Sequence, residues 1–128
     1  MTPTDIAKFW KTTADDDWET ANVLVTAHKY HHALFFCHLT LEKLLKGLVY
    51  SKKSSHPLPI HDLLKLAHQT GILVNEKREE QLKEITSWNI KARYDDYKLA
   101  FYQKATKDFT ETWMRIVKDL FVWIKNQY

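Results

Sequence analysis

Glycine and proline, the two residues that most often interrupt regular structure, are scarce in this chain. Only two glycines and three prolines occur among 128 residues. This scarcity predicts long helices joined by few turns, because an all-β chain of this length would need many more turn residues. We therefore expect an all-α fold, an antiparallel up-and-down bundle of about five helices, formed by one domain that spans residues 1–128.

Charge pattern and hydrophobic content exclude several classes of protein. Hydrophobic residues make up 45% of the chain, enough for a packed core, and the formal net charge is only +3. The 19 basic residues are interspersed with 16 acidic ones, so no basic block marks a nucleic-acid surface. The N-terminus lacks the apolar stretch of a signal peptide, and charged side chains interrupt the most apolar segment, residues 33–50. We expect a soluble, cytoplasmic protein without a membrane span.

Cysteine and histidine usage gives little sign of metal chemistry. Cys37 is the only cysteine, so neither an intrachain disulfide nor a thiolate cluster can form within one chain. It lies in the apolar run LFFCHL, which favours a small buried side chain over a nucleophile. His28 and His32 are four residues apart, but a predicted helix break separates them and no Glu-x-x-His pair exists. No metal and no cofactor are expected.

The first helix is predicted from its cap residues and its apolar spacing. Thr4 and Asp5 are candidate N-terminal caps, with Pro3 just before them. Apolar residues then recur at spacings of three and four as far as about His28. The acidic run at residues 15–17 is interpreted as solvated and as a partial interruption of this helix.

The second helix is predicted to be buried on several sides. Tyr30 and His31 are interpreted as a short break, after which a helix extends over about residues 32–51. Its apolar side chains cover more than half of its circumference, as expected of a helix that packs on several neighbours. Pro57 and Pro59 then predict an exposed loop, because proline is disfavoured in a helix interior.

Three more helices complete the predicted bundle. HDLLKLAHQTG is typical of a short helix with Gly71 as its C-terminal cap. Asn75 suits the start of a fourth helix, in which Leu82 and Ile85 form a thin apolar stripe. A last helix begins near Thr106, and its apolar residues alternate at spacings of four and three, the pattern of a bundle seam.

Residues 88–98, WNIKARYDDYK, combine aromatic, basic and acidic side chains more densely than the rest of the chain. The segment lies between the fourth and last predicted helices, where a connector is needed. If it is extended, Arg93 and Tyr94 point to opposite sides, so one can anchor while the other stays available. Asp95 and Asp96 would compete with any phosphate for Arg93, which predicts weak ligand binding.

Four segments occur in an order and spacing that resemble the HEPN domain family (the higher eukaryote and prokaryote nucleotide-binding domains). They are DDDWETANVL, HHALFFCHLTLEKLLKGLV, IHDLLKLA and NIKARYDDY, and together they extend over nearly the whole chain. ARYDDY is the most specific of them. The resemblance implies an antiparallel helical bundle that pairs as a homodimer. It also implies a small nucleotidyltransferase as the partner, in a toxin–antitoxin-like or nucleotide-binding pair.

Many HEPN domains are ribonucleases, and this chain departs from their signature. That signature, Arg-x4-6-His, pairs an arginine that stabilises charge at the scissile phosphate with a histidine that moves a proton. No arginine in this sequence is followed by a histidine at that spacing. Asp95 is a second departure, since relatives frequently have a proline after Arg-Tyr. This change predicts a less rigid connector and places a carboxylate near Arg93.

The resemblance and its departures favour one function and leave an alternative. The favoured interpretation is a non-catalytic, homodimeric nucleotide-binding or assembly module that partners a minimal nucleotidyltransferase. The alternative is a metal-independent ribonuclease toxin with a degenerate active site at Arg93, to which His38 or His61 is brought near in space. Nucleotide or RNA is the expected ligand in either case, and no membrane is involved.

Two sets of candidate residues follow. The candidates for binding a ligand or a partner are Arg93, Tyr94, Asp96, Tyr97, Lys43 and Lys46. The candidates for a structural or site-supporting role are Glu42, His61, Asp62 and His38. Asp62 suits the positive end of a helix dipole, and His61 is expected to hydrogen-bond across the loop and lock the bundle. In the structural alternative for the first set, Arg93 pairs with a neighbouring aspartate or a helix C-terminus while the tyrosines fasten the connector.

Overall fold

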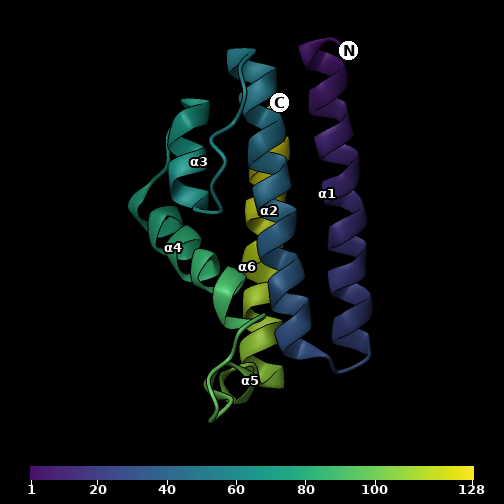
Figure 1. Ribbon diagram of the computed structural model, residues 1–128, viewed down its shortest axis with the longest axis vertical. Coiled ribbons are helices and arrows are strands. Elements are labelled where there is room, and N and C mark those ends of the chain that lie inside the picture. Colours follow the sequence, from purple (N-terminus) through teal and green to yellow (C-terminus); the bar gives the residue numbers. More distant parts are fainter.

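The computed structural model describes residues 1–128 and consists of helices and connecting loops, with no strand. The all-α helical bundle predicted from the sequence is therefore confirmed. Six helices form it: α1 (Pro3–Thr26), α2 (Tyr30–Lys53), α3 (Leu63–Thr70), α4 (Glu76–Lys91), α5 (Ala100–Lys104) and α6 (Lys107–Lys125). Figure 1 shows α2 at the centre, with α1 antiparallel on one side, α3 and α4 on the other, and α6 behind. No helix is long and apolar enough to cross a membrane.

The boundaries of α1 differ from the prediction at its start. Thr2, not Thr4, is the N-terminal cap: its hydroxyl accepts a hydrogen bond from the Asp5 amide at 3.1 Å, and the Asp5 carboxylate accepts one from the Thr2 amide at 3.0 Å. Pro3 occupies the first helical position, where its missing N–H costs nothing. The helix then continues through the acidic run without interruption.

The prediction that the acidic run is solvated was wrong for Asp17. Asp17 is buried and its carboxylate lies 2.7 Å from the Lys43 ammonium of α2. Asp15 lies 2.7 Å from the ammonium of Lys125, at the end of α6. Two of the three carboxylates thus join α1 to neighbouring helices, and only the third has no such partner.

The break between α1 and α2 lies at residues 27–29, earlier than predicted. His28 has φ of 60°, a left-handed conformation that turns the chain, and Tyr30 and His31 already belong to α2. Half of the 24 residues of α2 are buried, and the helix contacts α1, α3, α4, α5 and α6. The prediction that this helix packs on several neighbours is confirmed.

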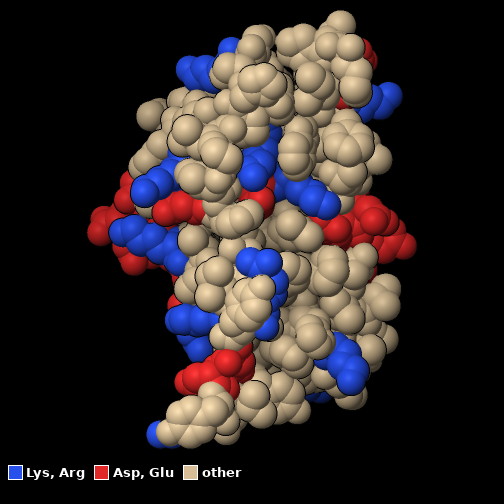
Figure 2. Space-filling model, in the orientation of Figure 1, with Lys and Arg blue, Asp and Glu red and all other residues tan.

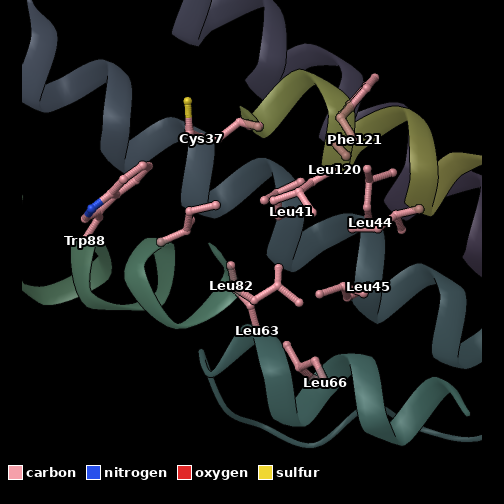
Figure 3. Close-up of a cluster of buried hydrophobic side chains, with 14 of the residues drawn as sticks. Cys37, Leu41, Leu44, Leu45, Leu63, Leu66, Leu82, Trp88, Leu120 and Phe121 are labelled. Carbon is pink, nitrogen blue, oxygen red and sulfur yellow. The ribbon is translucent and has the colours of Figure 1, made fainter. Parts of the chain in front are cut away.

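Leucine side chains from four helices fill the core around α2. Figure 3 shows Leu41, Leu44 and Leu45 of α2 directed toward the leucines of α3, α4 and α6. Cys37 belongs to the same cluster and is fully buried. Burial raises the pKa of its thiol well above the usual range, so it stays protonated and packs as a small hydrophobe.

The loop after α2 determines where α3 begins. It runs back along α2, so the first residue of α3, Leu63, lies beside α4, where its amide donates to the hydroxyl of Thr86 at 3.1 Å. The helix ends at Gly71, whose φ of 84° is the left-handed cap that the sequence predicts and whose Cα faces the Lys53 side chain at the end of α2. Figure 1 shows this loop returning along α2, and the return brings His61 to Glu42 in the middle of α2.

Candidate functional site

Only the second half of the WNIKARYDDYK segment is a connector. Trp88 to Lys91 form the last turn of α4, and the fully buried Trp88 indole donates to the Glu84 carboxylate at 2.7 Å. The backbone then turns rather than extending, with the Tyr94 amide hydrogen-bonded to the Ile90 carbonyl at 2.8 Å. The expectation that an extended strand places alternate side chains on opposite sides is therefore wrong.

Arg93 lies at the end of α4 without a carboxylate partner. Its side chain is exposed and forms none of the ion pairs in the structure. Its Nε donates to the carbonyl of Asn89 at 3.0 Å, and its guanidinium lies 5.6 Å from the Phe35 ring centroid and 5.5 Å from that of Tyr94. Its Nη2 also donates to Asn89 Oδ1 at 3.4 Å, so Asn89 and Phe35 position the group and only its remaining N–H groups are available to an anion.

The two aspartates of the connector do not compete for Arg93, contrary to expectation. Asp95 accepts hydrogen bonds from the amides of Phe101 and Tyr102 in α5, at 3.0 and 2.8 Å, and from the amide of Asp96. Asp96 accepts from the amides of Lys98 and Ala100. Both carboxylates are therefore used to form α5, a short helix that periodicity alone did not indicate. Desolvation raises the pKa of Asp95, but these amide hydrogen bonds outweigh it and hold that pKa below its ordinary value.

The two connector tyrosines are largely exposed. The relative exposure is 72% for Tyr94 and 90% for Tyr97. Neither ring is buried in the bundle, so the tyrosines do not fasten the connector as the structural alternative requires. The connector is fixed instead by the Asp95 carboxylate and by Phe101, which is buried.

Both candidate lysines on α2 are paired with carboxylates. The Lys43 ammonium lies 2.7 Å from Asp17, and the Lys46 ammonium donates to Glu42 Oε2 at 3.0 Å. Their positive charge is therefore compensated, and they add little to the field at Arg93. Figure 2 shows basic and acidic side chains intermixed across the middle of this face, with further acidic ones at both flanks.

Glu42 is the centre of a polar cluster between α2 and the loop before α3. Its carboxylate is buried, with 8% side-chain exposure, and accepts from His61 Nδ1 at 2.8 Å as well as from Lys46. Because the carboxylate can only accept, the His61 proton resides on Nδ1, and no hydrogen bond occupies Nε2. The His61 side chain is 59% exposed. The carboxylate thus holds an accessible imidazole in one tautomer.

His38 hydrogen-bonds to the backbone of this cluster and is buried. Its Nε2 donates to the carbonyl of His61 at 2.9 Å, which leaves Nδ1 as an acceptor without a donor, 3.8 Å from Glu42 Oε1. Desolvation lowers the pKa of His38, and the positive charges of His61 and Arg93 lower it further, against the opposing effects of the hydrogen bond and Glu42. The ring is neutral near pH 7 and fixes the loop that carries His61.

Asp62, the remaining candidate, caps α3: its Oδ1 accepts from the Lys65 amide at 3.0 Å.

Two supporting residues of Arg93, Phe35 and Asn89, were not among the candidates. Asn89 precedes Arg93 by four residues, the spacing of neighbours on one helix face, so the sequence did contain that signal. Phe35 could not be found in this way, because its contact joins two different helices. No group of three or more His, Cys, Asp or Glu side chains is arranged to hold a metal ion.

One protein-family model matches this chain. The model of the HEPN domain family matches residues 7–127, nearly the full length of the chain. No curated protein and no solved structure gives a match. The match includes α2 with Glu42, the loop with His61 and the connector with Arg93. This chain belongs to the HEPN domain family.

Proposed function

We propose that this protein is a non-catalytic nucleotide-binding and assembly module, in which Arg93 binds a phosphate of a nucleotide or of RNA. The observation that carries the proposal is the free guanidinium of Arg93, exposed and without a carboxylate partner. A guanidinium pre-oriented by Asn89 and Phe35 loses less freedom on binding a phosphate than an unsupported one does. With Lys43 and Lys46 neutralised, Arg93 acts alone and binding is weak.

The proposed assembly is a homodimer that uses the outward face of α2. Phe35 and Leu39 lie four residues apart on this face and are only half-buried, and Lys43 continues the same row. A two-fold axis across α2 would bury this row against its own copy and bring two Arg93 side chains toward one groove. The protomer is further proposed to partner a minimal nucleotidyltransferase in a toxin–antitoxin-like pair, as HEPN domains commonly do.

Binding at Arg93 is tested by an Arg93→Ala variant titrated with fluorescent single-stranded RNA and with nucleotides. We expect affinity to fall by about tenfold or more, the loss of one charge-assisted phosphate contact. Stability should change by less than about 1 kcal/mol, because Arg93 makes no buried ion pair. Arg115→Ala is the matched control, since Arg115 is exposed on α6 and also lacks an ion pair. If Arg93→Ala unfolds the protein while wild-type titrations stay flat, Arg93 is structural and the nucleotide site is wrong.

The oligomeric state is tested by sedimentation equilibrium. Wild-type protein is expected to be dimeric at micromolar concentration, and Leu39→Glu to be monomeric with an unchanged helical circular dichroism spectrum. A monomeric wild type would reject the homodimer. The nucleotidyltransferase partner is tested separately, by co-expression with the protein encoded by the adjacent gene.

The Glu42–His61 pair favours a second candidate function, a metal-independent ribonuclease. His61 is accessible and is held in one tautomer by Glu42, on a loop that His38 fixes to α2. His38 itself is buried, so only His61 could transfer a proton to or from RNA. Incubation of labelled RNA in the presence of a chelator distinguishes the functions. Cleavage that is abolished by His61→Ala and by Arg93→Ala would establish the ribonuclease and reject the non-catalytic module.

A further inference from the structure

A separate cavity lies at the end of the bundle where α1 turns into α2 and α5 joins α6. Its volume is about 350 Å³, within the usual range for small-molecule sites. Five ring-bearing side chains line it: His28, Tyr30, His31, His32 and Tyr102. None of them takes part in the cluster around Glu42 or supports Arg93. The sequence signal is the run HKYHH, in which Tyr30 and His31 are interpreted above as a helix break and His28 and His32 are set aside as metal ligands.

The rings are arranged in contact with one another. His28 and Tyr30 are stacked, with centroids 5.7 Å apart, and His31 and His32 lie 3.9 Å apart. Tyr102 of α5 approaches His31 edge-on at 5.2 Å. His28 holds its place in a left-handed backbone conformation, which is uncommon for a residue other than glycine. The wall therefore presents several flat faces from two distant parts of the chain, a surface that suits another flat ring.

Polar groups of the same wall suit an anion and a base edge. Lys29, which also lines the cavity, precedes α2 without a side-chain cap, and no hydrogen bond occupies the amides of Tyr30, His31 and His32. These amides and the Lys29 ammonium favour negative charge at this position. On the opposite side, the Gln103 side chain offers one donor and one acceptor group, and its amide nitrogen already donates to the Lys98 carbonyl.

We propose that this cavity binds a flat nitrogen heterocycle that carries a phosphate, such as a nucleoside monophosphate. The base stacks on the histidine and tyrosine rings, and the phosphate lies near Lys29 and the first turn of α2. A purely apolar ring would leave the polar wall unpartnered, and a lone anion would leave the ring faces uncovered. The site is distinct from the proposed phosphate contact at Arg93, and either can exist without the other.

The experiment is a titration of the full chain with the four nucleoside monophosphates, followed through the imidazole carbon-bound protons by NMR at one slightly alkaline pH. Of the seven histidines, His56 and His68 serve as internal controls, and His38 and His61 report separately on binding at Arg93. We expect saturable shifts of the His28, His31 and His32 signals. Adenosine and inorganic phosphate, titrated separately, should each bind more weakly than adenosine monophosphate.

Two variants complete the test. Tyr102→Ala should weaken binding by about tenfold, the loss of one stacking partner. Tyr102 is 56% exposed, so this variant is expected to fold, which circular dichroism checks. Phe9→Ala on α1, with a phenylalanine that is 57% exposed and does not line the cavity, is the matched control and should bind as the wild type does.

Three outcomes would overturn the proposal. They are the absence of any saturable shift up to millimolar ligand, shifts confined to His38 and His61, and equal effects of phosphate alone. Arg93→Ala should leave the shifts of the three cavity histidines unchanged. If it abolishes them, the ligand binds at Arg93 and the cavity is not the site.

Discussion

Replacement of Glu42 tests whether the polar cluster on α2 stabilises the fold. Glu42→Ala removes the acceptor of two hydrogen bonds, one from the half-exposed His61 and one from Lys46, whose side chain is only 13% exposed. A hydrogen bond to a charged group contributes about 1.5–3 kcal/mol when solvent is excluded and less when water competes. The Lys46 bond lies near the upper part of that range and the His61 bond below it. We expect a loss of about 2–4 kcal/mol in the free energy of unfolding.

The assay is urea denaturation followed by circular dichroism, with Glu42→Gln and His61→Ala measured beside the alanine variant. Glu42→Gln preserves the volume and one acceptor, so it should lose about half as much stability as Glu42→Ala. The double variant Glu42→Gln/His61→Ala should be less destabilised than the sum of the single variants, by about 0.5–1.5 kcal/mol, because the two side chains are in contact. The matched control is Glu80→Gln, since Glu80 is 70% exposed and pairs only with Lys83.

The opposite result has a definite meaning. If Glu42→Gln is as stable as the wild type or more stable, the buried carboxylate does not stabilise the fold, because the free-energy cost of its desolvation equals or exceeds its pairing energy. The structural interpretation of the Glu42–His61 pair would then be refuted, and retention of the carboxylate would have to serve proton transfer.

Three further predictions concern single residues elsewhere in the fold. The free energy of unfolding should decrease as pH falls below 6.5, because His38 binds a proton in the unfolded chain at a higher pH than it does in the folded one. Urea titrations of His38→Gln should show a free energy of unfolding that depends less steeply on pH. Gly47→Ala should lose about 1–3 kcal/mol in thermal or urea unfolding, because the added Cβ would lie 2.5 Å from the hydroxyl oxygen of Tyr128 and 2.7 Å from the Cβ of Trp10; unchanged stability would mean that both side chains shift without cost. Asp95→Ala should speed hydrogen exchange at the Phe101 amide, whereas unchanged exchange would mean that α5 does not depend on this carboxylate.

The helical elements were predictable because they depend on local signals. Scarce glycine and proline, apolar spacing, and the caps Asn75, Thr106 and Gly71 involve residues within one or two turns of one another. Their outcome therefore does not depend on the rest of the fold. The predictions failed where two local signals competed. Helix α1 begins after Thr2 because Thr2 and Asp5 form a reciprocal pair of hydrogen bonds, which Thr4 could not form.

The sequence also contained the residue types of the candidate site, but it did not show which of these residues pair with one another. A carboxylate near an arginine in sequence suggests an ion pair, yet the aspartate after Tyr94 turns to the amides of α5, whose existence no periodicity indicates. The partner of Lys43 is Asp17, on another helix, and the partner of Glu42 is His61, across a loop that doubles back along α2.

The sequence by itself thus determined the class of fold, most helix limits and the family, since these follow from short-range periodicity and from motif order. Only the tertiary structure decided that Arg93 is free, that Lys43 and Lys46 are compensated, that His61 rather than His38 is accessible, and that a ring-lined cavity forms at the end of the bundle. The reason is physical. Electrostatic pairing and desolvation depend on distances between residues far apart in the chain, and helix packing sets those distances.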